Sequence, residues 1–250
     1  LRRGTPLALV PTTLRRQIDA AVGVEHGINL GGSKKLVGGI HHPDLVLVDP
    51  GWLSTQDHRG LVCGTAEAIK VLAVADPAAY AHLRAVLECD GALPTVPRPE
   101  IVWTALSRKL DLLAEDPFET SSRRLLNYGH AFAHHFEEGS GFQLAHGEAV
   151  LLGMLIENEV SRGLGIGADD AIDGLQRVIR GLLTPACRDY WCGFDAMAPR
   201  LPQLRLMRRG LMNLVCLECP GRARIVDDAD DGVLGRAWAG AERWLAGVTT

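Results

Sequence analysis

From residue 56 onward, apolar residues recur at intervals of three to four for most of the remaining chain. This spacing places them on one face of a helix with about 3.6 residues per turn. Six segments carry the pattern: 66–74, 78–88, 100–114, 124–137, 148–162 and 168–183. A last helix is predicted over 233–245. The spacing therefore predicts a multihelical unit that occupies most of the chain.

The first 55 residues have a different pattern. Short apolar runs at 7–10 and 45–48 are bounded by turn residues, which is typical of buried strands. Between them, 12–22 is compatible with a helix that opens at a threonine, and 23–39 carries six glycines and is read as a loop or hairpin. We therefore predict the end of an α/β domain over 1–55 and a helical domain over 56–250. Within the latter, 212–226 resembles a strand hairpin that turns at 219–222.

Composition excludes several classes of protein. With 47% hydrophobic and 22% charged residues, the 250-residue chain is unlike a disordered protein, collagen or a coiled coil. Its formal net charge of −4 argues against a nucleic-acid partner held by bulk positive charge. Charges interrupt every apolar run before it reaches the ~18 residues of a membrane span. We expect neither nucleic acid nor membrane as a partner. A homodimer is compatible with the sequence.

The six cysteines and the amino terminus suggest a cytoplasmic location. Cys216 and Cys219 have the spacing of a metal pair, but they lie in a run that is typical of a strand. Buried thiols in a reducing compartment are the simpler interpretation. The chain starts at Leu1 without the pattern of a secretion signal, and this beginning leads us to expect further residues upstream.

Two histidine motifs are candidates for chemistry. His130 and His134 lie four residues apart, a spacing that lets two imidazoles on one helical face address one point. These two histidines either serve a metal or catalytic role or have this spacing by chance. His146 precedes a predicted helix and is followed by Gly147 and Glu148, so it either faces a cleft or caps that helix.

A third motif places charge inside an apolar segment. Glu67 and Lys70 are three residues apart, which is ordinarily a surface ion pair that contributes little. Their neighbours over 66–72 are otherwise apolar, which favours a site over solvent. One carboxylate and two histidines are a common set of zinc ligands that leaves positions open for a substrate oxygen.

Taken together, these motifs resemble the 3-dehydroquinate synthase family of the sugar phosphate cyclases. The resemblance is carried by Arg3-Gly4, Val10-Pro11-Thr12-Thr13, Ile18-Asp19, Asn29, Lys34, Val48-Asp49, Leu53, Thr55, Gly64-Thr65-Ala66-Glu67-Ala68-Ile69-Lys70, Leu125-Leu126-Asn127-Tyr128-Gly129-His130 and His146-Gly147-Glu148-Ala149-Val150. It implies the last part of a Rossmann-like NAD domain followed by a multihelical metal-binding domain, with the active site between them. The family's glycine-rich NAD loop, expected upstream of Arg3, is not in this chain.

The resemblance also implies roles for individual residues. Glu67, His130 and His146 correspond to ligands of a divalent metal, with zinc expected and cobalt as the alternative. The positions implied for NAD are Thr12, Thr13, Asp19, Lys34, Trp52, Leu53, Ser54 and Thr55, with Asp19 also among the polar positions around the substrate. The other positions implied around the substrate are Lys70, Lys109, Arg123, Asn127 and His134. We interpret His134 as a proton-transfer group or as a partner that only orients His130 or phosphate.

The reaction implied converts a seven-carbon sugar phosphate, 3-deoxy-arabino-heptulosonate 7-phosphate or a relative, into a carbocycle with loss of phosphate. NAD takes up hydride and returns it, so it is recycled. The pathway implied is the shikimate route to aromatic amino acids. Lys109 and Arg123 would suit a substrate carboxylate. Glu25, Lys35 and the Arg208-Arg209 pair depart from the family pattern, which leaves another substrate open.

Two alternatives remain at this level. A metal-dependent polyol dehydrogenase of related fold would use a similar ligand set but would release NADH. A non-catalytic remnant would keep a helical domain that binds metal or a partner without turnover. The motifs at 127–130 and 146–150 favour the cyclase.

Overall fold

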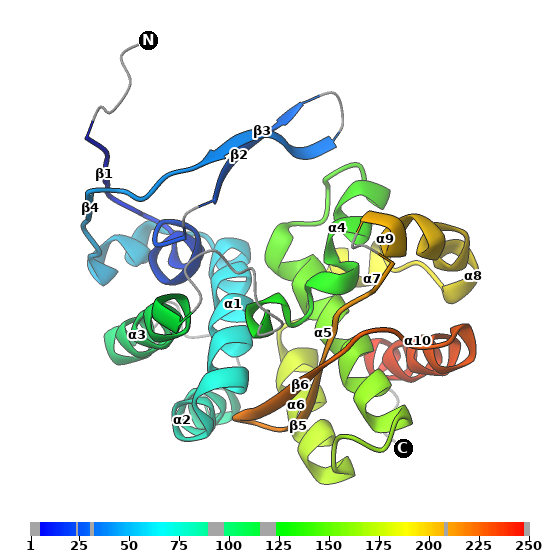
Figure 1. Ribbon diagram of the computed structural model, residues 1–250. Helices are drawn as coiled ribbons and strands as arrows, with labels where there is room; N and C mark the ends of the chain where they lie inside the picture. The colour runs from blue at the N-terminus through cyan, green and yellow to red at the C-terminus, as the bar shows by residue number, and fades with distance from the viewer. Residues whose placement is uncertain are drawn as a thin grey trace.

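The computed structural model describes residues 6–23, 25–30, 33–89, 98–115, 124–207 and 210–247. Figure 1 shows a strand-containing amino-terminal part above two groups of helices that meet at a central pair, α1 and α5. The predictions for Arg123, Arg208 and Arg209 concern positions outside these residues, and the side chains of Glu25, Lys34 and Lys35 also lie outside the described part of the structure.

The amino-terminal part contains two small sheets. Strands β1 (Ala8–Leu9) and β4 (Leu45–Val46) pair in parallel, and β2 (Glu25–Leu30) and β3 (Ser33–Ile40) form the antiparallel hairpin that the glycine pattern allowed. The prediction of buried strands at 7–10 and 45–48 is wrong for the apolar side chains, because Val10 and Leu45 are more than half exposed. Within the described part of the chain, β1 and β4 pair with each other and with no further strand.

A helical turn connects these sheets to the rest of the molecule. The helix expected over 12–22 is shorter, and its segment η1 (Arg16–Ala20) has π-helical character, with the Ala21 N–H donating to the Arg16 carbonyl. The turn η2 (Pro50–Thr55) follows β4 and is capped by the Asp49 carboxylate, which accepts from the Gly51 N–H.

Helices make up most of the remaining chain. They are α1 (His58–Ala75), α2 (Pro77–Cys89), α3 (Pro99–Glu115), α4 (His130–Gly139), α5 (His146–Gly163), α6 (Asp169–Gly181), α7 (Pro185–Asp189), α8 (Phe194–Met197), α9 (Leu201–Met207) and α10 (Asp231–Ala246), with short 3₁₀ turns η3 (Leu125–Asn127) and η4 (Ala198–Arg200). Helix α5 packs against α1, α4, α6 and α10, and its residues from 147 to 161 are buried. The buried residues of this central helix include polar ones, namely Glu148, Glu157, Asn158, Glu159 and Ser161.

Strands β5 (Leu214–Cys219) and β6 (Arg222–Val226) form the predicted hairpin and pack against α5 and η3. The single helix expected over 124–137 is wrong. The chain forms η3, turns at Gly129 with φ of 79° and only then starts α4 at His130. A left-handed residue cannot continue a helix, so this glycine sets where α4 begins. None of the helices in the described part of the chain is long and apolar enough to cross a membrane.

Candidate functional site

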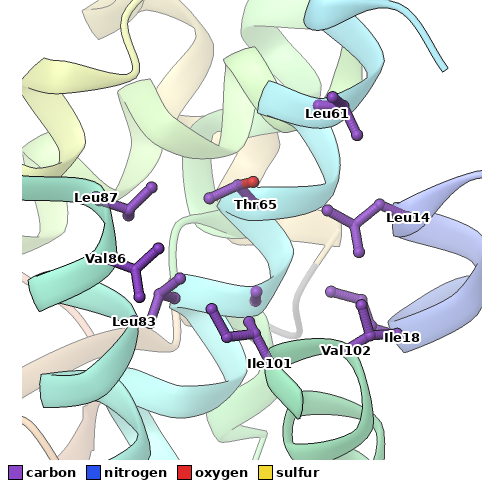
Figure 2. Close-up of a pocket in the computed structure, with 10 residues that line it drawn as sticks. Leu14, Ile18, Leu61, Thr65, Leu83, Val86, Leu87, Ile101 and Val102 are labelled. Atoms are coloured by element: carbon purple, nitrogen blue, oxygen red, sulfur yellow. The ribbon is translucent and has the colours of Figure 1, made fainter. Parts of the chain in front are cut away.

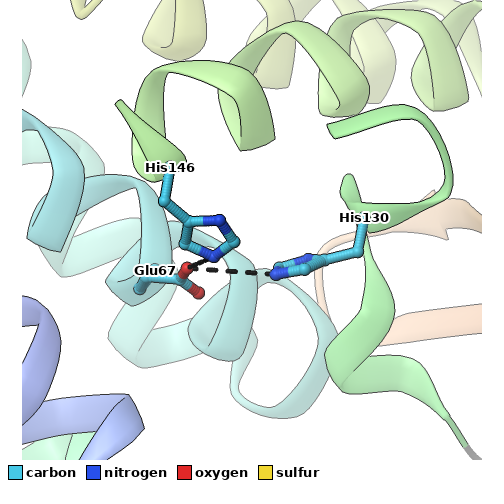
Figure 3. A group of neighbouring side chains, drawn as sticks. All are labelled: Glu67, His130 and His146. Atoms are coloured by element: carbon cyan, nitrogen blue, oxygen red, sulfur yellow. Dashed lines mark ion pairs between the residues drawn. The ribbon is translucent and has the colours of Figure 1, made fainter. Parts of the chain in front are cut away.

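Three side chains from three helices meet between α1, α4 and α5. Glu67 lies in the middle of α1, His130 is the first residue of α4, and His146 is the first residue of α5 (Figure 3). One ligand atom from each lies within 4.8 Å of the others. The Nε2 atoms of His146 and His130 lie 3.0 and 4.0 Å from Oε1 of Glu67. The structure thus brings together the three residues that the resemblance implied as ligands.

The electrostatics hold these groups in the forms that bind metal. Burial alone would raise the pKa of Glu67, but the charge of Lys70, 2.6 Å from Oε2, and the nearby imidazoles lower that pKa well below its usual value. Burial and the Lys70 charge lower the pKa of His130 well below its usual value. An ionised carboxylate beside a neutral imidazole is the state that metal ligation requires.

The donor set fits a divalent cation. Glu67 is fully buried, yet neither of its oxygens accepts a hydrogen bond of ordinary geometry from the described residues. A buried carboxylate with two imidazole nitrogens matches the ligands of catalytic zinc and leaves coordination positions open. The Lys70 ammonium lies against Oε2, so Oε1, which faces both imidazole nitrogens, is the oxygen placed to share a cation with them.

The turn before α4 positions His130. The buried carboxylate of Glu157, on α5, accepts from the Gly129 N–H at 3.0 Å and from the Ala131 N–H at 3.2 Å. It thereby caps the first turn of α4, where amide groups lack helical partners. The His130 Nδ1 lies 3.1 Å from the Tyr128 carbonyl, which directs Nε2 toward Glu67.

Glycine allows this turn to sit against α5. A Cβ at Gly153 would overlap the Gly129 carbonyl, and a Cβ at Gly129 would lie 2.7 Å from the Val150 carbonyl oxygen. Two glycines facing each other therefore let the His130 turn and α5 approach at main-chain distance.

His146 is held by contacts at the start of α5. The Ala145 N–H donates to Oε2 of Glu148, whose carboxylate also accepts two hydrogen bonds from the Arg59 guanidinium, at 2.9 and 2.6 Å. The Thr184 hydroxyl donates to the same carboxylate at 2.6 Å. Bidentate pairing of this kind fixes geometry as well as charge. The sequence left two roles open for His146, capping the helix or facing a site. The structure favours the second, because the ring nitrogen Nε2 lies 3.0 Å from Oε1 of Glu67.

Charged residues extend from the metal cluster toward η1. Lys70 pairs with Glu67 and, at 3.4 Å, with Asp19 on η1, which also pairs with Lys109 on α3. Both lysines are buried. Burial alone would raise the pKa of Asp19, but Lys70 and Lys109 outweigh it and lower that pKa. Glu67 and Lys70 are therefore a buried pair, in line with their apolar neighbours.

The positions implied for NAD lie mainly after the carboxyl ends of β1 and β4. Thr12 is exposed and Thr13 is half-buried; Trp52, Ser54 and Thr55 in η2 are exposed. The two segments are joined by Gln17, whose amide donates to the Pro11 and Asp49 carbonyls at 3.1 and 2.7 Å. Leu53 is fully buried in the core, so only its main chain remains for a cofactor.

The remaining implied residues lie on η3 and α4. Asn127 is half-buried at the end of η3. His134 is one turn along α4 from His130, with its ring centroid 6.2 Å from those of His130 and His146. Its Nδ1 contacts Glu137, a buried residue that the sequence reasoning missed. The available signal was the spacing of three between His134 and Glu137.

An apolar pocket is formed mainly by residues of η1, α1, α2 and α3 (Figure 2). It is lined by Leu14, Ile18, Leu61, Thr65, Ala68, Leu83, Val86, Leu87, Ile101 and Val102. Only Thr65 among these carries a polar side chain, so the pocket offers no acid, base or metal ligand. The cluster around Glu67 is the candidate site.

Comparison with known families identifies the chain. The profile described as 3-dehydroquinate synthase C-terminal matches residues 64–197, and the one described as 3-dehydroquinate synthase N-terminal matches residues 1–63. The chain belongs to the 3-dehydroquinate synthase family. The family predicted from the motifs is thereby confirmed.

Curated relatives of this family member include enzymes with different names. A 2-epi-valiolone synthase of Stigmatella aurantiaca is 35% identical over 92% of the chain and 59% of its own length. A 3-dehydroquinate synthase of Nitrobacter winogradskyi is 33% identical over 94% of the chain and 63% of its own length. The relatives are sugar phosphate cyclases, and the chain spans about three fifths of their length.

Solved structures confirm the fold class. The 2-epi-5-epi-valiolone synthase of Streptomyces hygroscopicus subsp. jinggangensis, solved with NAD⁺ and Zn²⁺, aligns with a TM-score of 0.82 at 30% identity, covering 97% of this chain and 68% of that one. A 2-deoxy-scyllo-inosose synthase with NAD⁺, Co²⁺ and carbaglucose-6-phosphate aligns at 0.76 and 20% identity, covering 98% and 68%, which supports the fold alone.

Proposed function

We propose that this protein is a sugar phosphate cyclase of the 3-dehydroquinate synthase type. It would convert a seven-carbon sugar phosphate into a carbocycle with loss of phosphate, using a divalent metal and recycled NAD⁺. The observation that carries the proposal is the convergence of Glu67, His130 and His146 beside the buried Lys70–Asp19 pair. This set combines ligands for a cation with fixed charges that can hold a polar substrate.

The residues of the chain have separate tasks in this proposal. When bound, the divalent cation supplies stabilisation of negative charge on a substrate oxygen and NAD⁺ supplies hydride acceptance and return. Glu67, His130 and His146 would hold the cation. Lys70, Lys109 and Asn127 would orient polar groups of the substrate, and His134, with its ring partly exposed beside the cluster, would move a proton.

The residues after β1 and β4 support the NAD⁺ part of the proposal. Thr12, Thr13, Ser54 and Thr55 follow the carboxyl ends of two parallel strands, where nucleotide ligands bind in open α/β sheets. Asp19 links this edge to the metal cluster through Lys70. A nicotinamide reaching from that edge toward Glu67 would come close to a substrate held by the cation.

We propose 3-deoxy-arabino-heptulosonate 7-phosphate or a relative as the substrate, and the shikimate route as its place if the former is used. The names of the relatives leave the choice of substrate open, since they include both a 3-dehydroquinate synthase and a 2-epi-valiolone synthase. The free thiols Cys63, Cys187, Cys192, Cys216 and Cys219 support a reducing, cytoplasmic location.

An activity assay tests the proposal. The protein with NAD⁺ and Zn²⁺ or Co²⁺ is given 3-deoxy-arabino-heptulosonate 7-phosphate or a seven-carbon sugar phosphate that lacks the carboxylate. We expect phosphate release and a carbocyclic product by NMR from one of them, without net accumulation of NADH. Accumulating NADH would favour the polyol dehydrogenase. No turnover, with tight metal binding, would favour the non-catalytic remnant.

Metal titration tests the ligand set separately from turnover. We expect His130→Ala and His146→Ala each to weaken Co²⁺ binding by at least about 100-fold, because each removes one of three protein ligands. Absorption of the bound Co²⁺ and calorimetry would measure this. His82→Ala, on α2 and exposed, is the matched control and should bind as the parent does. Unchanged affinity in both site variants would refute the ligand assignment.

A further inference from the structure

Glu137 contacts two imidazoles with its two carboxylate oxygens. Oε2 lies 3.0 Å from Nδ1 of His134, and Oε1 lies 3.2 Å from Nδ1 of His146. The side chain is 6% exposed, although the ring of His134 is partly open to solvent. His134 lies one turn before Glu137 on α4, whereas His146 begins α5. One buried acid therefore joins a proposed ligand to the proposed proton-transfer group.

The ring of His146 is held at both nitrogens. Its Nε2 faces Glu67 at 3.0 Å while its Nδ1 faces Glu137 at 3.2 Å. An imidazole that donates its Nδ1 proton to a carboxylate presents the lone pair of Nε2, which is the form that binds metal. His130 obtains the same orientation from the Tyr128 carbonyl. Each of the two imidazoles thus has an acceptor at Nδ1. The acceptor for His130 is a main-chain carbonyl, whereas the acceptor for His146 is the side chain of Glu137.

The main chain at Glu137 is fixed independently of the carboxylate. Its carbonyl accepts from the Ser140 hydroxyl at 2.9 Å and from the Phe142 N–H at 2.8 Å. The Ser140 oxygen in turn accepts from the Leu144 N–H at 3.1 Å. These contacts shape the short connection from α4 to His146, so a side-chain change at Glu137 leaves the connection supported.

We propose that Glu137 is a positioning residue that sets the tautomer and orientation of His146 and His134 together. This proposal deepens the proposed function and rests on it for the identity of the cation. Its consequence is that the geometry of the metal ligand and that of the proton-transfer group depend on one carboxylate. A change that moves Glu137 therefore disturbs both groups at once.

The test compares Glu137→Gln with Glu137→Asp and with Glu138→Gln, an exposed neighbour on the same helix. Glutamine keeps the size but offers one acceptor oxygen in place of two, so one imidazole loses its acceptor. We expect Glu137→Gln to weaken Co²⁺ binding by about 10- to 100-fold and to change the Co²⁺ absorption spectrum. Nitrogen NMR of the metal-free protein should show loss of a single Nδ1–H tautomer at one ring. Glu137→Asp keeps the charge and should recover part of the affinity, and Glu138→Gln should match the parent.

Two outcomes would overturn the proposal. Parent-like Co²⁺ affinity and histidine tautomers in Glu137→Gln would show that the contacts do not position the rings. A fall in Co²⁺ stoichiometry from two ions to one would show that Glu137 is itself a ligand, with His134 and His146, of a second cation. Circular dichroism verifies folding of each variant, and Glu137→Asp carries the test if the glutamine variant does not fold. Failure of the proposed function would instead appear as no phosphate release by the parent although Co²⁺ binds, and failure of the ligand assignment as unchanged Co²⁺ binding in His146→Ala.

Discussion

Replacing Gly153 with alanine should lower the free energy of unfolding by about 3 kcal/mol and weaken metal binding. A Cβ at this position would overlap the Gly129 carbonyl, which is main chain and cannot rotate away as a side chain would. Either α5 or the turn that carries His130 must move. Because His130 begins α4 directly after Gly129, that movement separates its ring from Glu67 and His146. Urea denaturation and Co²⁺ titration would measure the two effects.

Gly163→Ala is the matched control. Gly163 ends the same helix, and no atom lies within 4 Å of an added Cβ. Alanine is a better helix former than glycine, so this variant should equal the parent or gain up to ~1 kcal/mol. Parent-like stability and metal affinity in Gly153→Ala would contradict the close approach of α5 and the His130 turn.

Apolar spacing predicted most of the helices because each buries one face. The segments at 66–74 and 148–162 became α1 and α5, whose contact forms the centre of the core. The ligands Glu67, His130 and His146 were suggested by motifs that were weak singly and specific only as an ordered set. Their convergence follows from the packing of α1, α4 and α5, which no local pattern records.

The parts that sequence reasoning missed depend on contacts between distant segments. The helix expected over 124–137 breaks at Gly129, because the turn there faces Gly153 and is capped by Glu157. Glu137 and Glu157 resemble surface acids in the sequence, yet both are buried against groups that donate hydrogen bonds. Burial of a carboxylate depends on its tertiary partners, so such residues are recognised only once the helices are packed.

The charges around the site form one coupled series. Lys109, Asp19, Lys70 and Glu67 alternate in sign from α3 through η1 to α1, and all are buried or nearly so. In such a series, removing one charged residue leaves the opposite charge next to it buried without a partner. The resulting loss of folding free energy exceeds the net contribution of the intact ion pair. Lys70 lies between two carboxylates and is therefore the most sensitive member.

Lys70→Met should reduce the free energy of unfolding of the metal-free protein by ~3–5 kcal/mol at neutral pH. Methionine fills a similar volume, so the loss reports the charge left on buried Glu67 and, in part, on Asp19. Asp19 keeps Lys109 as a partner, whereas Glu67 keeps, among the described residues, the imidazoles of His130 and His146. Arg84→Met is the control, because Arg84 and Glu88 form an exposed ion pair on α2, and it should change stability by less than about 1 kcal/mol.

The pH dependence distinguishes lost charge compensation from lost packing. In the parent, the folded pKa of Glu67 is lowered, so its contribution is present above the unfolded pKa, about 4.3, and is lost as pH falls through the folded value. In Lys70→Met, burial is no longer outweighed and the folded pKa of Glu67 should rise. The deficit relative to the parent should then be largest near neutral pH and shrink as pH falls below about 5, because Glu67 becomes protonated in the variant. Urea denaturation with a chelator at several pH values would measure it. A deficit that stays constant with pH would assign the loss to packing and refute the electrostatic account.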